Sequence, residues 1–392
     1  MKMRRITLIG LFFLVMAVVI WVWGLPGERR ADAKNRAYAE SAALSLSYAA
    51  NFGVDSCGGF RILWVRNGKM PPLRWLLRDS LSPSNVPPDL AELPRLALPV
   101  ERMTILSSTY LGYLSALKVP ERIVGVDSKK YIADSAFYRR VDSLRVSEVG
   151  EGVELSPEKI YGLRSDAIFA FSTGETIHDA YPKLSQLKMP VVLTSEWREK
   201  HPLGKAEWIK FFGVLTGREA LADSLFSQSE KKYLAIKGRL DLLKDSERPV
   251  VFTGTPSSGS WLASSGNSFM AALIRDAGGI YLWRSDSASE TLSLPFERAL
   301  IDVQKADVWI NAGGYATLDE ISANEERIRL FPVWKSGEIY GYDLRKGPAG
   351  GLDYYESAVV KPDSLLLDVA KILHPALFPG ISSKWYRKLS NI

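Results

Sequence analysis

The feature that most constrains this chain is a helical segment at residues 205–246, which separates two halves with the same order of elements. Trp208, Phe212 and Leu215 recur at helical spacing in its first part. Thr216 and Glu219 have the spacing of a capping box, which predicts that a helix restarts there and extends for about 40 Å at roughly 1.5 Å per residue. Such a segment suits a rigid spine between two lobes, and a long surface helix in one large domain is the alternative.

Strands and helices alternate on both sides of this spine. Before it, we expect strands at 102–106, 123–126, 166–171 and 189–193, with helices at 111–117, from 156, and at 181–187. After it, we expect strands at 250–252, 280–283, 307–310 and 338–340, with helices at 268–277, from 295, at 321–330 and at 362–373. This alternation predicts an α/β protein with two Rossmann-like lobes and mainly parallel sheets. Residues 99–204 are the expected N-terminal lobe and residues 247–392 the C-terminal lobe.

The N-terminal region has a different character. An unbroken apolar run begins at Ile6 and ends at Leu25, long enough to cross a bilayer as a helix, and basic residues precede it. Residues 1–30 are therefore an expected signal anchor that places the rest outside the cytoplasm, or a signal peptide cleaved near residues 31–33. We expect residues 31–98 to form a stalk and a small β region, with a hairpin of strands 60–66 and 75–77 after the turn at Asn67 and Gly68.

Composition excludes several functional classes. The 392 residues carry a net charge of +6 without a dense Lys/Arg run, so we expect no nucleic-acid partner. One cysteine, Cys57, and three scattered histidines give no basis for a protein-held metal site. The sequence also lacks the glycine-rich and nucleophile motifs of common enzymes. We therefore expect a protein that is not an enzyme and has no resident cofactor.

Loops that follow strands are where ligands of open α/β sheets bind. Here those loops are rich in hydroxyl and aromatic side chains, which suit a large, flat or partly apolar ligand in a cleft between the lobes. The candidate ligand-binding residues are Ser108, Thr109, Tyr110, Thr173, Glu175, Trp197, Trp261, Tyr315, Tyr354 and Tyr355.

Two glutamates occupy matching places in the two halves. Glu158 and Glu297 each lie in the first turn of an expected helix, after a proline and before a strand that begins at an aspartate. Either carboxylate alone could simply complement a helix dipole. As a pair on two lobes, they suggest two exposed carboxylates that dock on arginines of a partner.

From about Arg102 to its C-terminus, the chain resembles the substrate-binding proteins of ABC importers for iron chelates (siderophore or haem) and vitamin B12. The order of several short segments carries the resemblance: residues 123–126, 158–160, 165–168, 202–208, 268–279, 295–297 and 362–363. Residues 202–208 and the pair His374 and Pro375 are similar to the branch common in Bacteroidetes lipoproteins.

The resemblance implies a class III periplasmic-binding-protein fold and a monomer in the periplasm. It also implies an ABC permease with its ATPase as partners, a metal-chelate ligand in the inter-lobe cleft, and Glu158 and Glu297 as the permease-docking residues. The lipoprotein cysteine of the family is missing, which favours the N-terminal helix as the membrane tether. Relatives that bind bare metal ions use several cleft histidines, so a metal complex fits this chain better. A scaffold or sensor with the same fold, or a tetrapyrrole-processing enzyme that uses His178 or Glu175, are the alternatives.

Overall fold

The computed structural model describes residues 44–68, 70–171, 184, 187, 189–288 and 291–390. The predicted membrane segment between Ile6 and Leu25, the predicted helix at 181–187 apart from Leu184 and Leu187, and the candidates Thr173, Glu175 and His178 lie outside the described residues. Within the described part, no helix combines the length and apolar character needed to cross a bilayer. The described chain forms two compact units, the first at residues 44–45, 54–64 and 74–97 and the second from the remaining segments.

The first unit contains most of a four-stranded sheet with the order β1-β2-β3-β4. Its elements are β1 (Phe52–Cys57), β2 (Phe60–Val65), β3 (Leu73–Arg78), α3 (Pro88–Ala91) and β4 (Arg95–Ala97). Phe60, Ile62, Leu76 and Leu90 form its small core. The predicted neighbours 60–66 and 75–77 are adjacent strands, β2 and β3, whereas β1 and β4 were not predicted.

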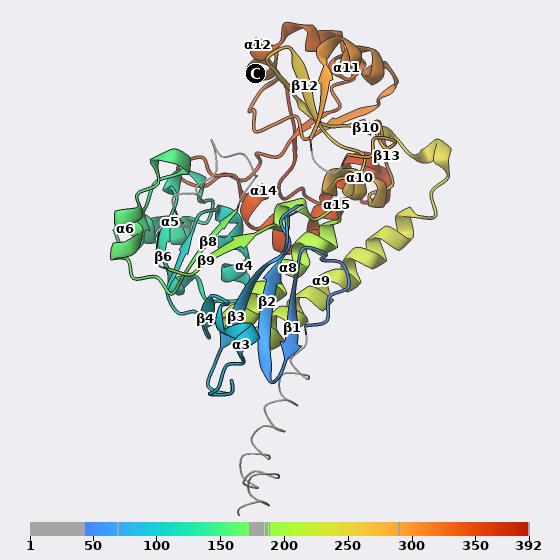
Figure 1. Cartoon of the computed structure of the whole chain (residues 1–392). Helices are drawn as coiled ribbons and strands as arrows, with labels where there is room; N and C mark the ends of the chain where they lie inside the picture. Colours follow the sequence, from blue (N-terminus) through green and yellow to red (C-terminus); the bar gives the residue numbers. More distant parts are fainter. Residues whose placement is uncertain are drawn as a thin grey trace, which may run out of the picture. The chain divides into compact units, whose positions relative to one another are not determined.

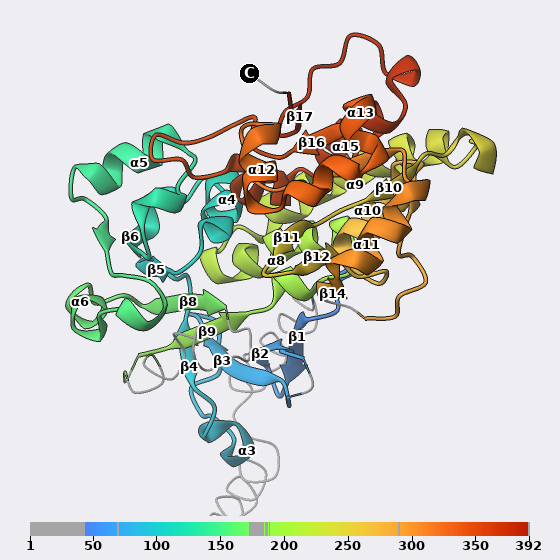
Figure 2. The same cartoon turned by 90° about the horizontal axis from the view of Figure 1, so that it is seen from above.

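The second unit begins its α/β core with a parallel sheet of order β7-β6-β5-β8-β9. The strands are β5 (Met103–Ile105), β6 (Ile123–Val126), β7 (Ser147–Glu148), β8 (Ala167–Phe171) and β9 (Val191–Thr194). The α-helices of this lobe are α4 (Ser108–Ala116), α5 (Ser135–Asp142) and α6 (Pro157–Gly162). Figure 2 shows this lobe in teal and green on the side of α8 opposite to the orange C-terminal lobe.

The C-terminal lobe has a second, mainly parallel sheet of order β13-β10-β15-β16-β17, in which only β17 runs antiparallel. A separate antiparallel sheet, β11-β12-β14, lies in the same lobe. The strands are β10 (Val250–Phe252), β11 (Thr255–Ser257), β12 (Ser260–Ser264), β13 (Ile280–Tyr281), β14 (Thr291–Pro295), β15 (Val308–Ile310), β16 (Ile339–Gly341) and β17 (Arg387–Lys388). The helices are α10 (Phe269–Asp276), α11 (Phe296–Asp302), α12 (Leu318–Asn324), α13 (Pro332–Ser336), α14 (Asp353–Glu356) and α15 (Pro362–Leu373).

Short 3₁₀ helices complete the connections. They are η1 (Pro120–Arg122), η2 (Lys129–Tyr131), η3 (Gly152–Glu154), η4 (Glu196–Arg198), η5 (Asp245–Glu247), η6 (Val303–Lys305), η7 (Glu326–Leu330), η8 (Ala358–Val360) and η9 (Pro375–Leu377).

The predicted spine consists of two helices, α8 (Pro202–Thr216) and α9 (Glu219–Leu240), seen in yellow-green in Figure 1. The chain breaks between them because Gly217 adopts a left-handed conformation with φ 68°. The predicted capping box is wrong: the Thr216 hydroxyl donates to the carbonyl of Phe212, 2.7 Å away, in the last turn of α8. A residue that completes one helix cannot also cap the next, so α9 begins without a side-chain cap.

Helix α8 is buried on almost every side, as expected for a helix at the centre of a large core. Two buried carboxylates, one within α8 and one just before it, hold the segment at residues 47–51. Glu207 accepts hydrogen bonds from the backbone N–H groups of Ser47 and Tyr48 at 3.0 and 2.8 Å, and of Ala49 at 2.9 Å. Glu199 accepts the next two N–H groups, those of residues 50 and 51, at 3.1 and 3.0 Å. Residues 47–51 are therefore fixed to the spine by charge-assisted hydrogen bonds.

Candidate functional site

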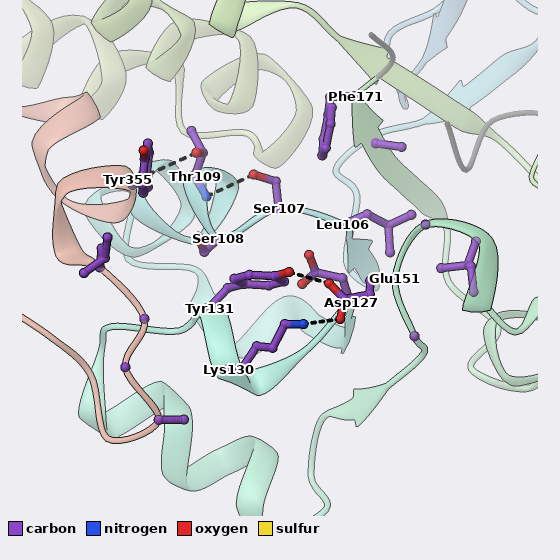
Figure 3. Close-up of a pocket in the computed structure, with 18 residues that line it drawn as sticks. Leu106, Ser107, Ser108, Thr109, Asp127, Lys130, Tyr131, Glu151, Phe171 and Tyr355 are labelled. Atoms are coloured by element: carbon purple, nitrogen blue, oxygen red, sulfur yellow. Dashed lines mark hydrogen bonds and ion pairs between the residues drawn. The ribbon is translucent and has the colours of Figure 1, made fainter. Parts of the chain in front are cut away.

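A cavity of about 680 Å³ lies at the carboxyl ends of β5, β6 and β8 (Figure 3). These ends coincide because Ile105 pairs with both Val126 and Phe169 in the parallel sheet. Apolar side chains from the N-terminal lobe, including Leu106, Leu155 and Phe171, line one part of it. Residues 349–352 and Tyr355, from the C-terminal part of the chain, supply another wall. The cavity is therefore built by segments more than 170 residues apart.

Hydroxyl groups line the cavity where α4 begins. Ser107 is the N-cap of α4, and its hydroxyl accepts a hydrogen bond from the Thr109 N–H at 3.3 Å. The Thr109 hydroxyl donates to the backbone carbonyl of Tyr355 at 3.0 Å. Ser108, at the first position of the helix, also lines the cavity. This end of the cavity therefore offers hydrogen-bonding hydroxyls and the positive end of a helix dipole.

The wall at residues 347–356 is held tightly against the N-terminal lobe. Glu356 is buried, and its carboxylate accepts the backbone N–H groups of Ala133 and Asp134 at 2.8 and 3.0 Å. A Cβ atom on Gly351 would lie only 2.4 Å from the carbonyl carbon of Tyr131. Only glycine permits so close an approach, so this wall is in direct backbone contact with the opposite side of the cavity.

Charged groups gather at the end of the cavity formed by the loops after β6 and β7. The ammonium of Lys130 and the hydroxyl of Tyr131 both donate to the carboxylate of Glu151 (Figure 3). These two hydrogen bonds, that of Lys130 first, hold the pKa of Glu151 below its usual value. Asp127 accepts the Ser128 N–H at 2.8 Å. Burial, with a smaller contribution from Glu151, raises the pKa of Asp127 to about 6.

Three of the predicted ligand residues line this cavity: Ser108, Thr109 and Tyr355. Tyr354 is nearly buried and packs against the ring of Tyr355 at 5.3 Å, so it supports the lining residue from behind. Tyr315 is half-buried and is not a lining residue of the cavity. The candidates Thr173 and Glu175 follow β8 but lie outside the described residues.

Two predicted ligand residues are corrected by the structure. Tyr110 is fully buried, and its hydroxyl lies 2.7 Å from that of Thr194. Trp261 is also fully buried, because it lies on the inward face of β12 rather than in a loop. Its indole N–H donates to the Thr253 carbonyl at 3.0 Å, and its ring packs against Phe296 and three other aromatic rings. Neither side chain has surface to offer a ligand.

Trp197 lies in a smaller cavity of about 350 Å³, away from the residues above. The guanidinium of Arg198 lies over its ring at 4.4 Å from the ring centre. The indole N–H of Trp197 is buried and has no acceptor among the described residues. The lining of this second cavity is mixed, with Phe269 and Met270 beside the basic residues Arg198 and Lys200.

The predicted docking residues are both exposed. Glu158 lies in the first turn of α6, where it accepts the hydroxyl of Ser156 at 3.2 Å. Glu297 lies in the first turn of α11 and pairs with Arg327 at 2.8 Å. Its own backbone N–H and Arg327 hold its pKa below the usual value. Because Arg327 also pairs with Glu325 at 2.7 Å, the local arrangement leaves a net negative charge at this surface.

Sequence reasoning missed Asp127, Lys130, Tyr131 and Glu151 as lining residues. The available signal was the position of Asp127 directly after the predicted strand at 123–126. Among the residues the structure describes, no three His, Cys, Asp or Glu side chains are arranged to hold a metal ion.

Comparison with known proteins bears on the fold. Residues 104–343, more than half of the chain, match the model of a family described as periplasmic binding protein. An uncharacterized lipoprotein of Methanocaldococcus jannaschii is 22% identical over 300 residues, which span 74% of this chain and 69% of that protein.

Three solved structures are similar to this one. A periplasmic heme binding protein from Pseudomonas aeruginosa has a TM-score of 0.56 and 17% identity, covering 74% of this chain and 99% of that chain. A possible iron-binding periplasmic solute-binding protein from Staphylococcus epidermidis has a TM-score of 0.53 and 16% identity, covering 70% of this chain and 99% of that chain. A Helicobacter pylori protein with Ni(II) bound has a TM-score of 0.53 and 13% identity, covering 73% of this chain and 87% of that chain. These likenesses confirm the predicted two-lobed α/β fold.

Proposed function

Because the chain belongs to the periplasmic binding protein family, we propose that it is the substrate-binding component of an ABC importer. In this proposal it captures a metal chelate, such as an iron siderophore, haem or a corrinoid, and delivers it to a permease. The titles of the similar structures, which name heme, iron and Ni(II), support a ligand of this kind.

The cavity of about 680 Å³ is the observation that carries the proposal. Its volume lies in the range of small-molecule sites, and its lining combines apolar surface with a few polar groups, as such sites do. Its walls come from both halves of the chain, so a bound chelate would contact the N-terminal lobe and the segment at 347–356 together. The described residues provide no ready-made metal ligand set, which favours a cargo that arrives with its own chelator.

The experiment is a ligand screen by thermal unfolding, followed by calorimetry. A chelate present at 100 times its dissociation constant should stabilise the protein by about 2.7 kcal/mol. A panel of siderophores, haem and corrinoids that leaves the unfolding temperature unchanged, and shows no binding heat, rejects the proposal.

Delivery would use Glu158 and Glu297, which both remain exposed in the first turns of their helices. Replacing both with alanine should abolish uptake in cells while leaving chelate affinity in solution unchanged, because neither lines the cavity. A matched control replaces two other exposed glutamates, Glu154 and Glu326, with alanine and should transport normally. Retained uptake in the first double variant rejects docking through these residues.

The tether is the last part of the proposal. The apolar run that begins at Ile6 and ends at Leu25 would hold the protein at the outer side of the inner membrane. N-terminal sequencing of the native protein tests this, because a mature chain that starts near Lys34 is a secreted protein without the tether.

A further inference from the structure

The charge of the 680 Å³ cavity restricts what it can bind. Its described lining holds three ionisable side chains that carry a full charge near neutral pH: the carboxylates of Asp127 and Glu151 and the ammonium of Lys130. Their formal charges leave the lining with one net negative charge. An anionic ligand would have to be attracted by some other group, so the partners of each charge decide the preference.

The single lysine is already engaged. The ammonium of Lys130 binds the carboxylate of Glu151, which also accepts the Tyr131 hydroxyl. Lys130 could meet an anion only by giving up part of this contact. By contrast, Asp127 accepts the backbone N–H of Ser128 and pairs with no lysine or arginine of the described chain. Figure 3 shows its carboxylate next to the Tyr131 and Glu151 side chains that line the cavity. Asp127 is therefore the charge with an unused capacity to bind a cation.

The wall from the C-terminal part of the chain adds no charged side chain to the described lining of the cavity. Arg345 pairs with Asp353 at 3.2 Å, and Lys346 pairs with Asp343 at 2.9 Å. These two basic residues directly precede the glycine-rich stretch that lines the cavity. Asp353 compensates Arg345, whereas Asp343 is shared by Lys346 and by Arg387, which it contacts at 2.7 Å. None of these three basic side chains is in the described lining of the cavity.

The adjoining part of the lining, where α4 begins after β5, favours neutral acceptors. There, Ser107, Ser108 and the first turn of α4 offer hydroxyls and a helix end equivalent to about half a positive charge. The partial positive charge at the N-terminus of α4 is smaller than the full negative charge of Asp127. The helix end can therefore orient carbonyl or hydroxamate oxygens of a ligand without reversing the net charge of the site. These two neighbouring parts of the lining together suit a ligand that carries both oxygen acceptors and a cationic or N–H group.

We propose that the chelate bound in this cavity is neutral or positively charged, with an ammonium or N–H group directed at Asp127 and oxygen acceptors directed at Ser107 and Ser108. The inference rests on the proposed function, and it excludes polyanionic chelates as the preferred cargo.

The test uses full-length protein and probes that share one ferric core and differ in the charge of a terminal group. Ferrioxamine B carries a free ammonium on a neutral ferric trihydroxamate core, its acetylated form has no charge, and its succinylated form ends in a carboxylate. A corrinoid pair, cationic aquocobalamin and a polycarboxylate corrinoid, repeats the comparison on a different core. Haem and a ferric tricatecholate serve as anionic chelates. We expect affinity in the order ammonium, acetamide, carboxylate, with at least about a tenfold loss across the series.

The outcomes separate this inference from the function on which it rests. Selective binding of haem or the tricatecholate upholds a chelate-binding protein but overturns the charge preference, and it would direct attention to the cavity at Trp197, where Arg198 and Lys200 lie. Equal affinity for all three trihydroxamates, when these bind, also overturns it. No binding by any probe rejects the proposed function itself.

A matched pair of variants assigns the preference to one carboxylate. Asp127→Asn keeps the shape of the side chain and should reduce the ratio of ammonium to acetamide affinity to about one. Asp142→Asn removes an exposed carboxylate of α5 that pairs with Lys129 outside the cavity, and it should leave the ratio unchanged. Thermal unfolding of both variants controls for folding. An unchanged ratio in a folded Asp127→Asn protein contradicts the assignment.

Discussion

Replacing Glu356 with glutamine should change how the stability of the protein depends on pH. The Glu356 side chain is buried where the cavity wall meets the N-terminal lobe, and it accepts two backbone N–H groups at 2.8 and 3.0 Å. Its pKa is raised from 4.5 to about 7, mainly by burial and to a smaller extent by the carboxylates of Asp353 and Asp134, against the opposing effect of the two N–H groups. The two N–H groups bind different oxygens of Glu356, so a glutamine oxygen can still accept one of these hydrogen bonds whereas its amide nitrogen cannot accept the other. This loss is the same at every pH, and the glutamine side chain does not titrate, so the pH dependence isolates the effect of ionisation.

The size of the effect follows from the pKa. A rise from 4.5 to about 7 corresponds to on the order of 3 kcal/mol at 1.36 kcal/mol per unit. Because the pKa is higher in the folded state, this stabilisation is fully present below about pH 4.5 and is lost as the pH rises through about 7. The free energy of unfolding of the glutamine variant minus that of the wild type should therefore be more positive at pH 8 than at pH 5.

Urea unfolding of the wild type and the Glu356→Gln variant at pH 5 and pH 8 measures this directly. Other titrating groups contribute equally to both proteins and cancel in the difference. The exposed Glu326 provides a control, since Glu326→Gln should follow the pH dependence of the wild type. Parallel stability curves for the wild type and Glu356→Gln would refute the reasoning, because they would mean that Glu356 titrates alike in the folded and unfolded chains.

Three other outcomes are expected. Affinity for an ammonium-bearing chelate should fall about tenfold between pH 7 and pH 5, because Asp127, which faces Lys130 and Glu151, has a pKa of about 6 and loses its charge on protonation; calorimetry across this range checks it. Gly351→Ala should destabilise the protein by roughly 1–3 kcal/mol in urea unfolding and weaken chelate binding in titration. Gly162→Ala, whose Cβ would have open space around it, should change neither the stability nor the affinity. Trp261→Ala should cost roughly 3–5 kcal/mol of stability, while Tyr355→Ala should lower chelate affinity and leave the unfolding temperature nearly unchanged.

Parallel-sheet geometry made part of the site predictable. Ser108 and Thr109 follow a short apolar strand, and such strands end at a common edge of the sheet. Local pattern is sufficient for this, because the strand, the N-cap serine and the helix are adjacent in sequence. Tyr355 was found in the same way, although its place in the wall depends on backbone contacts with the other lobe.

The errors come from long-range pairing. Trp261 lies in a stretch rich in glycine and serine, which resembles a loop, but pairing with β14 makes it a central strand residue and turns its ring into the core. Thr216 and Glu219 have the right spacing for a cap, yet Gly217 between them ends the first helix. Asp127 follows a predicted strand, but Glu151 carries no local signal that distinguishes it from other acidic residues. Only the loops after neighbouring strands β6 and β7 bring the two carboxylates together.

The hydrogen bonds at residues 47–51 have a consequence for any shortened form of this protein. Glu207 of α8 and Glu199 just before this helix are buried, and they accept hydrogen bonds from the N–H groups of these five residues, about 150 positions earlier in the sequence. A chain that starts at residue 52 would leave two carboxylates in the interior without these donors, although Lys210 would still contact Glu207 at 3.1 Å. We therefore expect a fragment that keeps the stability of the α/β core to begin before Ser47, well upstream of the first strand of that core.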